Sequence, residues 1–155
     1  MDRIIERIKG NEKIVILGIG NRLKGDDAVG SIIAEKLKEK IKNKNILVID
    51  AENIPENYIE VIKKNKPSLI LIIDSVDFNS TPGDFRIFKI DEIKDTTIST
   101  HNLSLSLLKI LFEDTEIYIM GIQPEKIKIG EEISFNVLKA IDKIISFFDE
   151  NMQNL

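Results

Sequence analysis

The sequence lacks cysteine and tryptophan altogether, and it contains a single histidine among its 155 residues. Without cysteine the chain can form no disulfide bond, no thiolate nucleophile and no thiolate metal site. A lone histidine also excludes every local motif that needs two imidazoles, such as His-x-x-x-His. A metal site in this chain would therefore have to use carboxylates, the imidazole of His101 or water.

Long apolar runs and an excess of basic charge are absent as well. No apolar stretch approaches the roughly 20 residues that cross a bilayer. The segment MDRIIERIKGNEK at the start is charged throughout and has no apolar signal-peptide core. The formal net charge of −4 argues against a nucleic-acid partner, which normally requires a basic face. We therefore expect a cytoplasmic protein with no membrane insertion and no nucleic-acid partner.

The sequence does contain a regular alternation of two periodicities. Short apolar runs predict strands at residues 13–19, 45–50, 68–74, 84–90 and 116–122, and the alternating pattern of 84–90 is typical of an edge or antiparallel strand. Apolar residues at helical spacing predict helices at 27–41, after Pro55, at 103–112 and at 134–150. The last helix is expected to bury Val137, Leu138, Ile141, Ile144, Ile145 and Phe148. This order predicts a single α/β domain over residues 1–155, with a mostly parallel sheet of about five strands between helices.

The stretch GIGNRLKGDDAVG, residues 18–30, follows the first predicted strand. It opens like a dinucleotide-binding fingerprint, but Leu23 stands where the third glycine belongs. Asp26 and Asp27 would repel a pyrophosphate at the start of the next helix, which argues against nucleotide binding. By themselves the two acids fit a structural role, as a helix N-cap and a first-turn acid, as well as a functional one.

Their location favours a functional role. Asp27 comes just after the first predicted strand, and Asp74 closes the apolar strand 68–74. Ligands of open α/β sheets bind beyond the carboxyl ends of the strands, and a carboxylate that closes an apolar strand costs free energy unless it is solvated or paired. His101 follows the loop 91–100, which is expected to return to the carboxyl ends of these strands. Two carboxylates and one imidazole could converge there as an incomplete metal site with open positions.

Other interpretations of these residues stay open on the pattern alone. A single histidine is more often structural or merely exposed than a ligand. Ser75 or Thr100 could act as a hydroxyl nucleophile with Asp74 and His101, although no G-x-S-x-G motif accompanies them. A non-catalytic metal- or ligand-binding α/β module would use the same residues without hydrolysis, and a structural protein would leave the acids solvated and apart.

Four segments, in this order, resemble the hydrogenase maturation endopeptidases, which trim the C-terminus of the large subunit of nickel–iron hydrogenases. They are GIGNRLKGDDAVG (18–30), IIDSVDF (72–78), STHNLSL (99–105) and MGIQPE (120–125). The THN and GIQP elements are more similar to the branch that serves formate-hydrogenlyase-type hydrogenases than to the uptake-hydrogenase branch. The resemblance implies a three-layer α/β/α fold with a mixed sheet.

The resemblance also implies a site. The family's three metal-binding residues fall on Asp27, Asp74 and His101, and Asp27 and Asp74 are the candidates for the general base. Asp26 is expected to orient its neighbour or to cap a helix. The glycine turn would then present an acid to a cation. Ala28 stands where many members have glycine, so that position should not need a positive φ.

The activity implied is that of an endopeptidase, an aspartyl-type protease that acts on a hydrogenase large-subunit precursor. The family is thought to recognise nickel that is already inserted in the precursor, so that cleavage reports completed metal loading. Imidazole and carboxylate ligands suit nickel. Nickel would be supplied by the substrate, and the resemblance leaves open whether the resting enzyme carries a metal.

Overall fold

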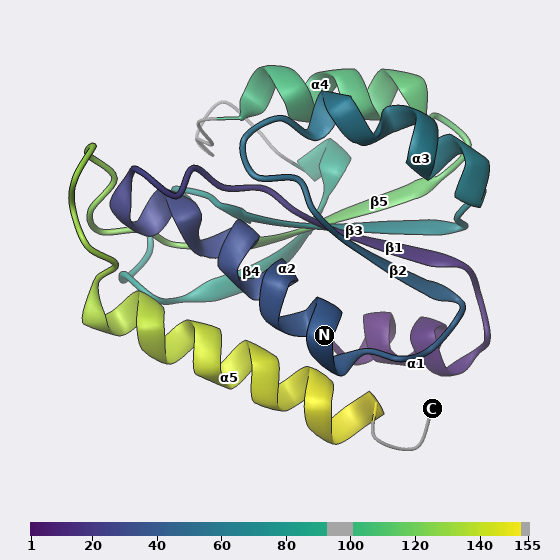
Figure 1. The fold of residues 1–155 in the computed structure, drawn as a ribbon, viewed down its shortest axis with the longest axis horizontal. Coiled ribbons are helices and arrows are strands. Elements are labelled where there is room, and N and C mark those ends of the chain that lie inside the picture. Colours follow the sequence, from purple (N-terminus) through teal and green to yellow (C-terminus); the bar gives the residue numbers. More distant parts are fainter. Residues whose placement is uncertain (93–100, 153–155) are drawn as a thin grey trace.

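The computed structural model describes residues 1–92 and 101–152, which form one five-stranded sheet with helices on both faces (Figure 1). The strands are β1 (Ile14–Gly18), β2 (Ile46–Asp50), β3 (Leu69–Ser75), β4 (Phe85–Lys89) and β5 (Glu116–Ile122). The α-helices are α1 (Asp2–Lys9), α2 (Val29–Lys40), α3 (Ile59–Asn65), α4 (Asn102–Leu111) and α5 (Phe135–Met152). Short 3-10 helices are η1 (Gly25–Ala28), η2 (Pro55–Tyr58) and η3 (Ile90–Glu92).

The strand order is β2-β1-β3-β5-β4, with β4 antiparallel and the other strands parallel to one another. The expected mostly parallel mixed sheet, with 84–90 as its antiparallel edge strand, is confirmed. Since β2 and β3 lie on opposite sides of β1, the direction in which the sheet grows reverses between β1 and β3. Ligands of α/β sheets bind at such a switch point, outside the carboxyl ends of the strands.

Two apolar cores sandwich the sheet and explain why the inner strands are apolar throughout. Helices α1, α2 and α5 cover one face, and α3 and α4 cover the other (Figure 1). Along β3, Leu69, Leu71 and Ile73 pack in the first core, while Ile70 and Ile72 pack in the second. This is the period-two alternation of a strand that is buried on both faces. None of the helices described is long and apolar enough to cross a membrane.

Helix α1 was not predicted, because the first segment was interpreted only by its charged residues. Its residues Ile4, Ile5 and Ile8 recur at helical spacing and are buried in the first core. The prediction that Leu138 faces inward is wrong, since this side chain is 47% exposed. Ala140 lies on the buried face of α5 instead, in the first core.

Glycine allows α2 to lie very close to the strands that carry the site. A Cβ at Gly30 would lie 2.1 Å from the carbonyl oxygen of Ile73 and 2.2 Å from that of Ile19. A Cβ at Gly18 would lie 2.2 Å from the carbonyl oxygen of Gly30. The last glycine of the GDDAVG motif is therefore a packing residue, which holds the first turn of α2 against the ends of β1 and β3.

We predict that Gly30→Ala destabilises the protein by about 1–3 kcal/mol or more, because its methyl group would press on backbone that cannot rotate away. Gly10→Ala is the control, since its Cβ would lie 3.4 Å and 3.5 Å from its nearest neighbours. We expect that variant to stay within about 0.5 kcal/mol of the parent. Urea unfolding measures both, and equal losses in the two variants would contradict the packing role.

Candidate functional site

Asp74 lies near the carboxyl end of β3, on the face that α3 and α4 cover. It continues the alternation of Ile70 and Ile72, whose side chains pack in the core on that side. Its side chain is fully buried, and its register partner on β5 is Gly121. A buried carboxylate costs free energy unless other groups compensate it. The strand therefore places a reactive group at the switch point, where a partner is required.

His101 supplies such a partner. It stands at the N-cap position of α4, on the same face, and its backbone carbonyl accepts the N–H of Leu105. Its Nδ1 lies 3.1 Å from Oδ1 of Asp74, so a protonated Nδ1 donates to the carboxylate. The imidazole is 8% exposed. Two of the three predicted site residues, 27 positions apart in sequence, are thus in direct contact.

The charge around His101 favours its protonated form. Burial alone would lower the pKa of His101, but the hydrogen bond to Asp74 and the charges of Asp74, Asp27 and Glu56 outweigh burial. The net effect raises the pKa of His101 above its ordinary value of 6.5. Asp27 is therefore close enough for its charge to act on the imidazole, although it comes from a different loop.

Asp27 reaches this position through a tight turn. Gly25 has a φ of +52°, and a Cβ there would lie 2.4 Å from the carbonyl oxygen of Lys126, so the turn requires glycine. The chain then forms η1, in which Asp27 is almost completely buried. Ala28 has a φ of −77°, which confirms that this position needs no positive φ.

The interpretation of the two aspartates as an N-cap and a first-turn acid is only half right, since both lie in the first turn of η1 but neither is an N-cap residue. Lys24 and Ala28 occupy the N-cap positions of η1 and α2, and neither helix has a capping side-chain hydrogen bond. Asp26 is fully buried and instead binds a distant part of the chain. Its carboxylate accepts the backbone N–H groups of Glu125, Lys126 and Ser134 and the hydroxyl of Ser134.

The predicted metal triad is only partly assembled by direct contacts. Asp74 and His101 meet, and Asp27 acts on His101 through its charge. Within residues 1–92 and 101–152, no three His, Asp or Glu side chains lie together as a group that could hold a metal ion. Ser75, considered as a nucleophile, is buried, and Thr100 lies outside the described residues. The shared metal site thus stays a prediction.

Gln123 is a structural residue of the site region that the sequence pattern did not identify. Its buried amide oxygen accepts the N–H groups of Phe78 and Ser80, and its Nε2 donates to Asp77. This hydrogen bond is the main reason why the pKa of Asp77 is lowered. The MGIQPE and IIDSVDF motifs are therefore joined by one side chain, a pairing that only a known contact between the segments could have indicated.

Comparison with known proteins identifies the family to which the chain belongs. The profile of a family described as hydrogenase maturation protease, HycI, matches residues 32–149. The chain belongs to this family. A hydrogenase maturation protease is an enzyme, so the interpretation as a non-catalytic or purely structural protein is not supported. The resemblance found in the four motifs is confirmed.

Relatives and solved structures agree with this assignment. A Methanocaldococcus jannaschii protein, assigned by name to the hydrogenase maturation proteases, is 39% identical over 162 residues, covering 96% of both chains. The hydrogenase 3 maturation protease of Escherichia coli K12 is 40% identical over 114 residues, covering 72% of each chain. The crystal structure of HycI from Thermococcus kodakarensis has a TM-score of 0.81 at 27% identity, covering 97% of this chain and 99% of that one. The α/β fold of this maturation protease is thus that of its family.

We predict that Asp74→Asn lowers the pKa of His101, because the largest favourable charge is lost while burial remains. NMR titration of the untagged protein measures this directly, since the chain has one histidine. Glu12→Gln is the control, because Glu12 binds Arg7 and Ser68 at the opposite edge of the sheet and should leave the titration unchanged. A pKa in Asp74→Asn equal to that of the parent would contradict the assigned contact.

The same shift predicts how stability depends on pH. A pKa that is higher in the folded state means that the Asp74–His101 contact stabilises the fold fully at pH values below 6.5. This contribution is lost as the pH rises through the folded pKa. Unfolding free energies of the parent and of Asp74→Asn should therefore differ more below that pH range than above it.

Proposed function

We propose that this maturation protease removes a short C-terminal peptide from a nickel-loaded hydrogenase large-subunit precursor. The observation that carries the proposal is the contact between Asp74 and His101 at the switch point of the sheet, with Asp27 near enough to act on the imidazole. These residues come from the end of β3, the start of α4 and the loop after β1. The site thus offers oxygen and nitrogen donors from three separate segments, which is the donor chemistry that suits nickel.

The distance between the two contacting donors supports a shared ion. Two ligand atoms that each lie about 2.1 Å from one ion are about 3.0–3.4 Å apart at octahedral to tetrahedral angles. The Oδ1 of Asp74 and the Nδ1 of His101 are 3.1 Å apart. Little movement of these two groups is therefore needed for both to bind the nickel of the precursor, and without an ion they hydrogen-bond to each other.

The nickel belongs to the substrate in this proposal, and the enzyme reads it. Asp27, Asp74 and His101 contact the metal centre of the precursor and thereby fix the C-terminal tail beside the site. A metal-polarised water or carbonyl then allows hydrolysis of the amide, with Asp27 or Asp74 as the general base. A precursor without nickel offers these donors nothing to bind, so its tail is not held for cleavage.

We predict that the enzyme cleaves a nickel-loaded large-subunit precursor and leaves the nickel-free precursor intact. Incubation of each form with the purified enzyme, followed by mass spectrometry, detects loss of the C-terminal peptide. A precursor that already lacks this peptide serves as the control for unspecific proteolysis. Cleavage of both forms at equal rates would mean that the enzyme does not recognise nickel.

We further predict that Asp27→Asn and His101→Ala abolish this cleavage, because each removes a donor to the nickel. Both residues are buried, so some loss of melting temperature is expected. Assays should therefore be run well below the melting temperature of each variant. Ser75→Ala is the matched control, and its parental cleavage would exclude a serine nucleophile. Folded Asp27→Asn or His101→Ala enzyme that cleaves at the parental rate would reject the assigned site.

A further inference from the structure

The buried carboxylate of Asp26 joins the glycine-rich loop, residues 18–30, to a segment about a hundred residues further along the chain. We call the hydrogen bonds between these two segments the seam. Its Oδ2 accepts the N–H groups of Glu125 and Lys126, both at 2.9 Å, and the hydroxyl of Ser134 at 2.9 Å. Its Oδ1 accepts the N–H of Ser134 at 2.7 Å. The three backbone N–H groups can only donate, and both carboxyl oxygens of Asp26 serve as their acceptors.

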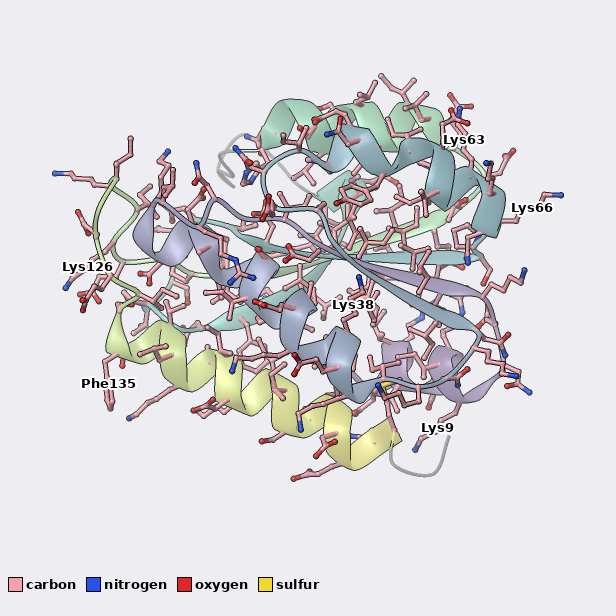
Figure 2. All side chains as sticks on the ribbon, in the orientation of Figure 1. Lys9, Lys38, Lys63, Lys66, Lys126 and Phe135 are labelled. Atoms are coloured by element: carbon pink, nitrogen blue, oxygen red, sulfur yellow. The ribbon has the colours of Figure 1, made fainter. Side chains whose placement is uncertain are left out.

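The backbone continues the same seam. The N–H of Asp26 donates to the carbonyl of Lys126 at 2.6 Å, and the N–H of Gly130 donates to the carbonyl of Leu23 at 2.9 Å. The β5–α5 connection, residues 123–134, is therefore tied to the glycine-rich loop along several residues. In Figure 2 the labelled Lys126 marks this connection at the end of the molecule opposite Lys66, which follows α3.

This seam is one of the attachments that place Asp27. Within its own loop, Asp27 donates its N–H to the carbonyl of Lys24 and accepts the N–H of Asn21, but these bonds move together with the loop. Towards β2, Gly20 donates to the carbonyl of Glu52 and holds the start of the loop. On the other side the loop is held through Asp26. Successive side chains of a 3-10 helix diverge by about 120°, so Asp26 can bind the connection while Asp27 points elsewhere.

We propose that Asp26 is a positioning residue, which sets the place of Asp27 by fixing the glycine-rich loop to the β5–α5 connection. The proposal rests on the proposed function, because it assumes that Asp27 acts on the precursor. It assigns the two adjacent aspartates different tasks. Asp26 binds the enzyme's own β5–α5 connection, and Asp27 contacts the substrate.

The test is the kinetics of Asp26→Asn on the nickel-loaded precursor. Asparagine keeps the shape but turns an NH₂ group towards at least one N–H donor, so the seam loosens. We expect kcat to fall by about 10²-fold with little change in KM, because a displacement of about 1 Å at a catalytic group costs that much. Ile8→Ala is the matched control. Ile8 is buried in α1, on the first core, so this variant loses stability without touching the seam.

Parental kcat in folded Ile8→Ala together with the loss in Asp26→Asn supports positioning, because general destabilisation does not lower the kcat of folded enzyme. Equal losses in both variants would overturn it. A second variant, Ser134→Ala, removes one donor from the opposite side of the seam and leaves the carboxylate in place. We expect a smaller fall in kcat, which should largely vanish in the Asp26→Asn background. Parental kcat in folded Ser134→Ala would also count against the proposal.

Asp27→Asn, assayed alongside, separates the two proposals. An inactive Asp27→Asn beside a fully active, folded Asp26→Asn overturns the positioning role and leaves the proposed function intact. An Asp27→Asn enzyme with parental cleavage overturns both, since Asp27 would then have no task for which its position matters.

Discussion

The buried carboxylate of Asp74 imposes the constraint around which the site is arranged. β3 is covered on both faces, so an acid at its carboxyl end cannot simply be solvated. A buried charge is tolerated only when other groups compensate it, and His101 is placed by α4 to do so at 3.1 Å. The same contact raises the pKa of His101 and keeps together, at the switch point, two of the groups that we propose to bind the nickel of the precursor.

The strand order explains why the candidate site lies at the carboxyl ends of β1 and β3. The glycine-rich loop leaves β1, and Asp74 ends β3, which is the neighbour of β1 in the sheet. Gly30 brings the first turn of α2 into contact with both strands. The helices after β1 and before β3 lie on opposite faces, and the carboxyl ends of such neighbouring strands are where α/β sheets bind their ligands.

The β5–α5 connection holds the surroundings of the site from two sides. Asp26 ties it to the loop that carries Asp27, and Gln123 ties it to the loop that follows Asp74. Both residues are buried, and most of their hydrogen bonds are to backbone N–H groups. Some polar residues in the family motifs therefore fix the backbone that carries the residues for which we propose a role in substrate binding.

The sequence by itself determined the fold class and much of the site. Apolar runs such as 68–74 and the alternation of 84–90 predicted the strands and their kind, because burial on two faces or one leaves different periodicities. The position of acids after strand ends pointed to Asp27 and Asp74, and four motifs identified the family. Helix α1 was missed, since its charged residues concealed three isoleucines at helical spacing.

Only the tertiary structure decided how these residues divide their tasks. Asp26 and Asp27 are adjacent and chemically identical, and the sequence gives no reason why one should face Ser134 and the other should act on His101. That difference depends on contacts across about a hundred residues, such as the bond from Lys126 to Asp26. It depends likewise on which face of the sheet each side chain of β3 points to, because this alternation places Asp74 on the side of α4. Local patterns record burial and turn chemistry, whereas long-range hydrogen-bond partners are fixed only when the chain has folded.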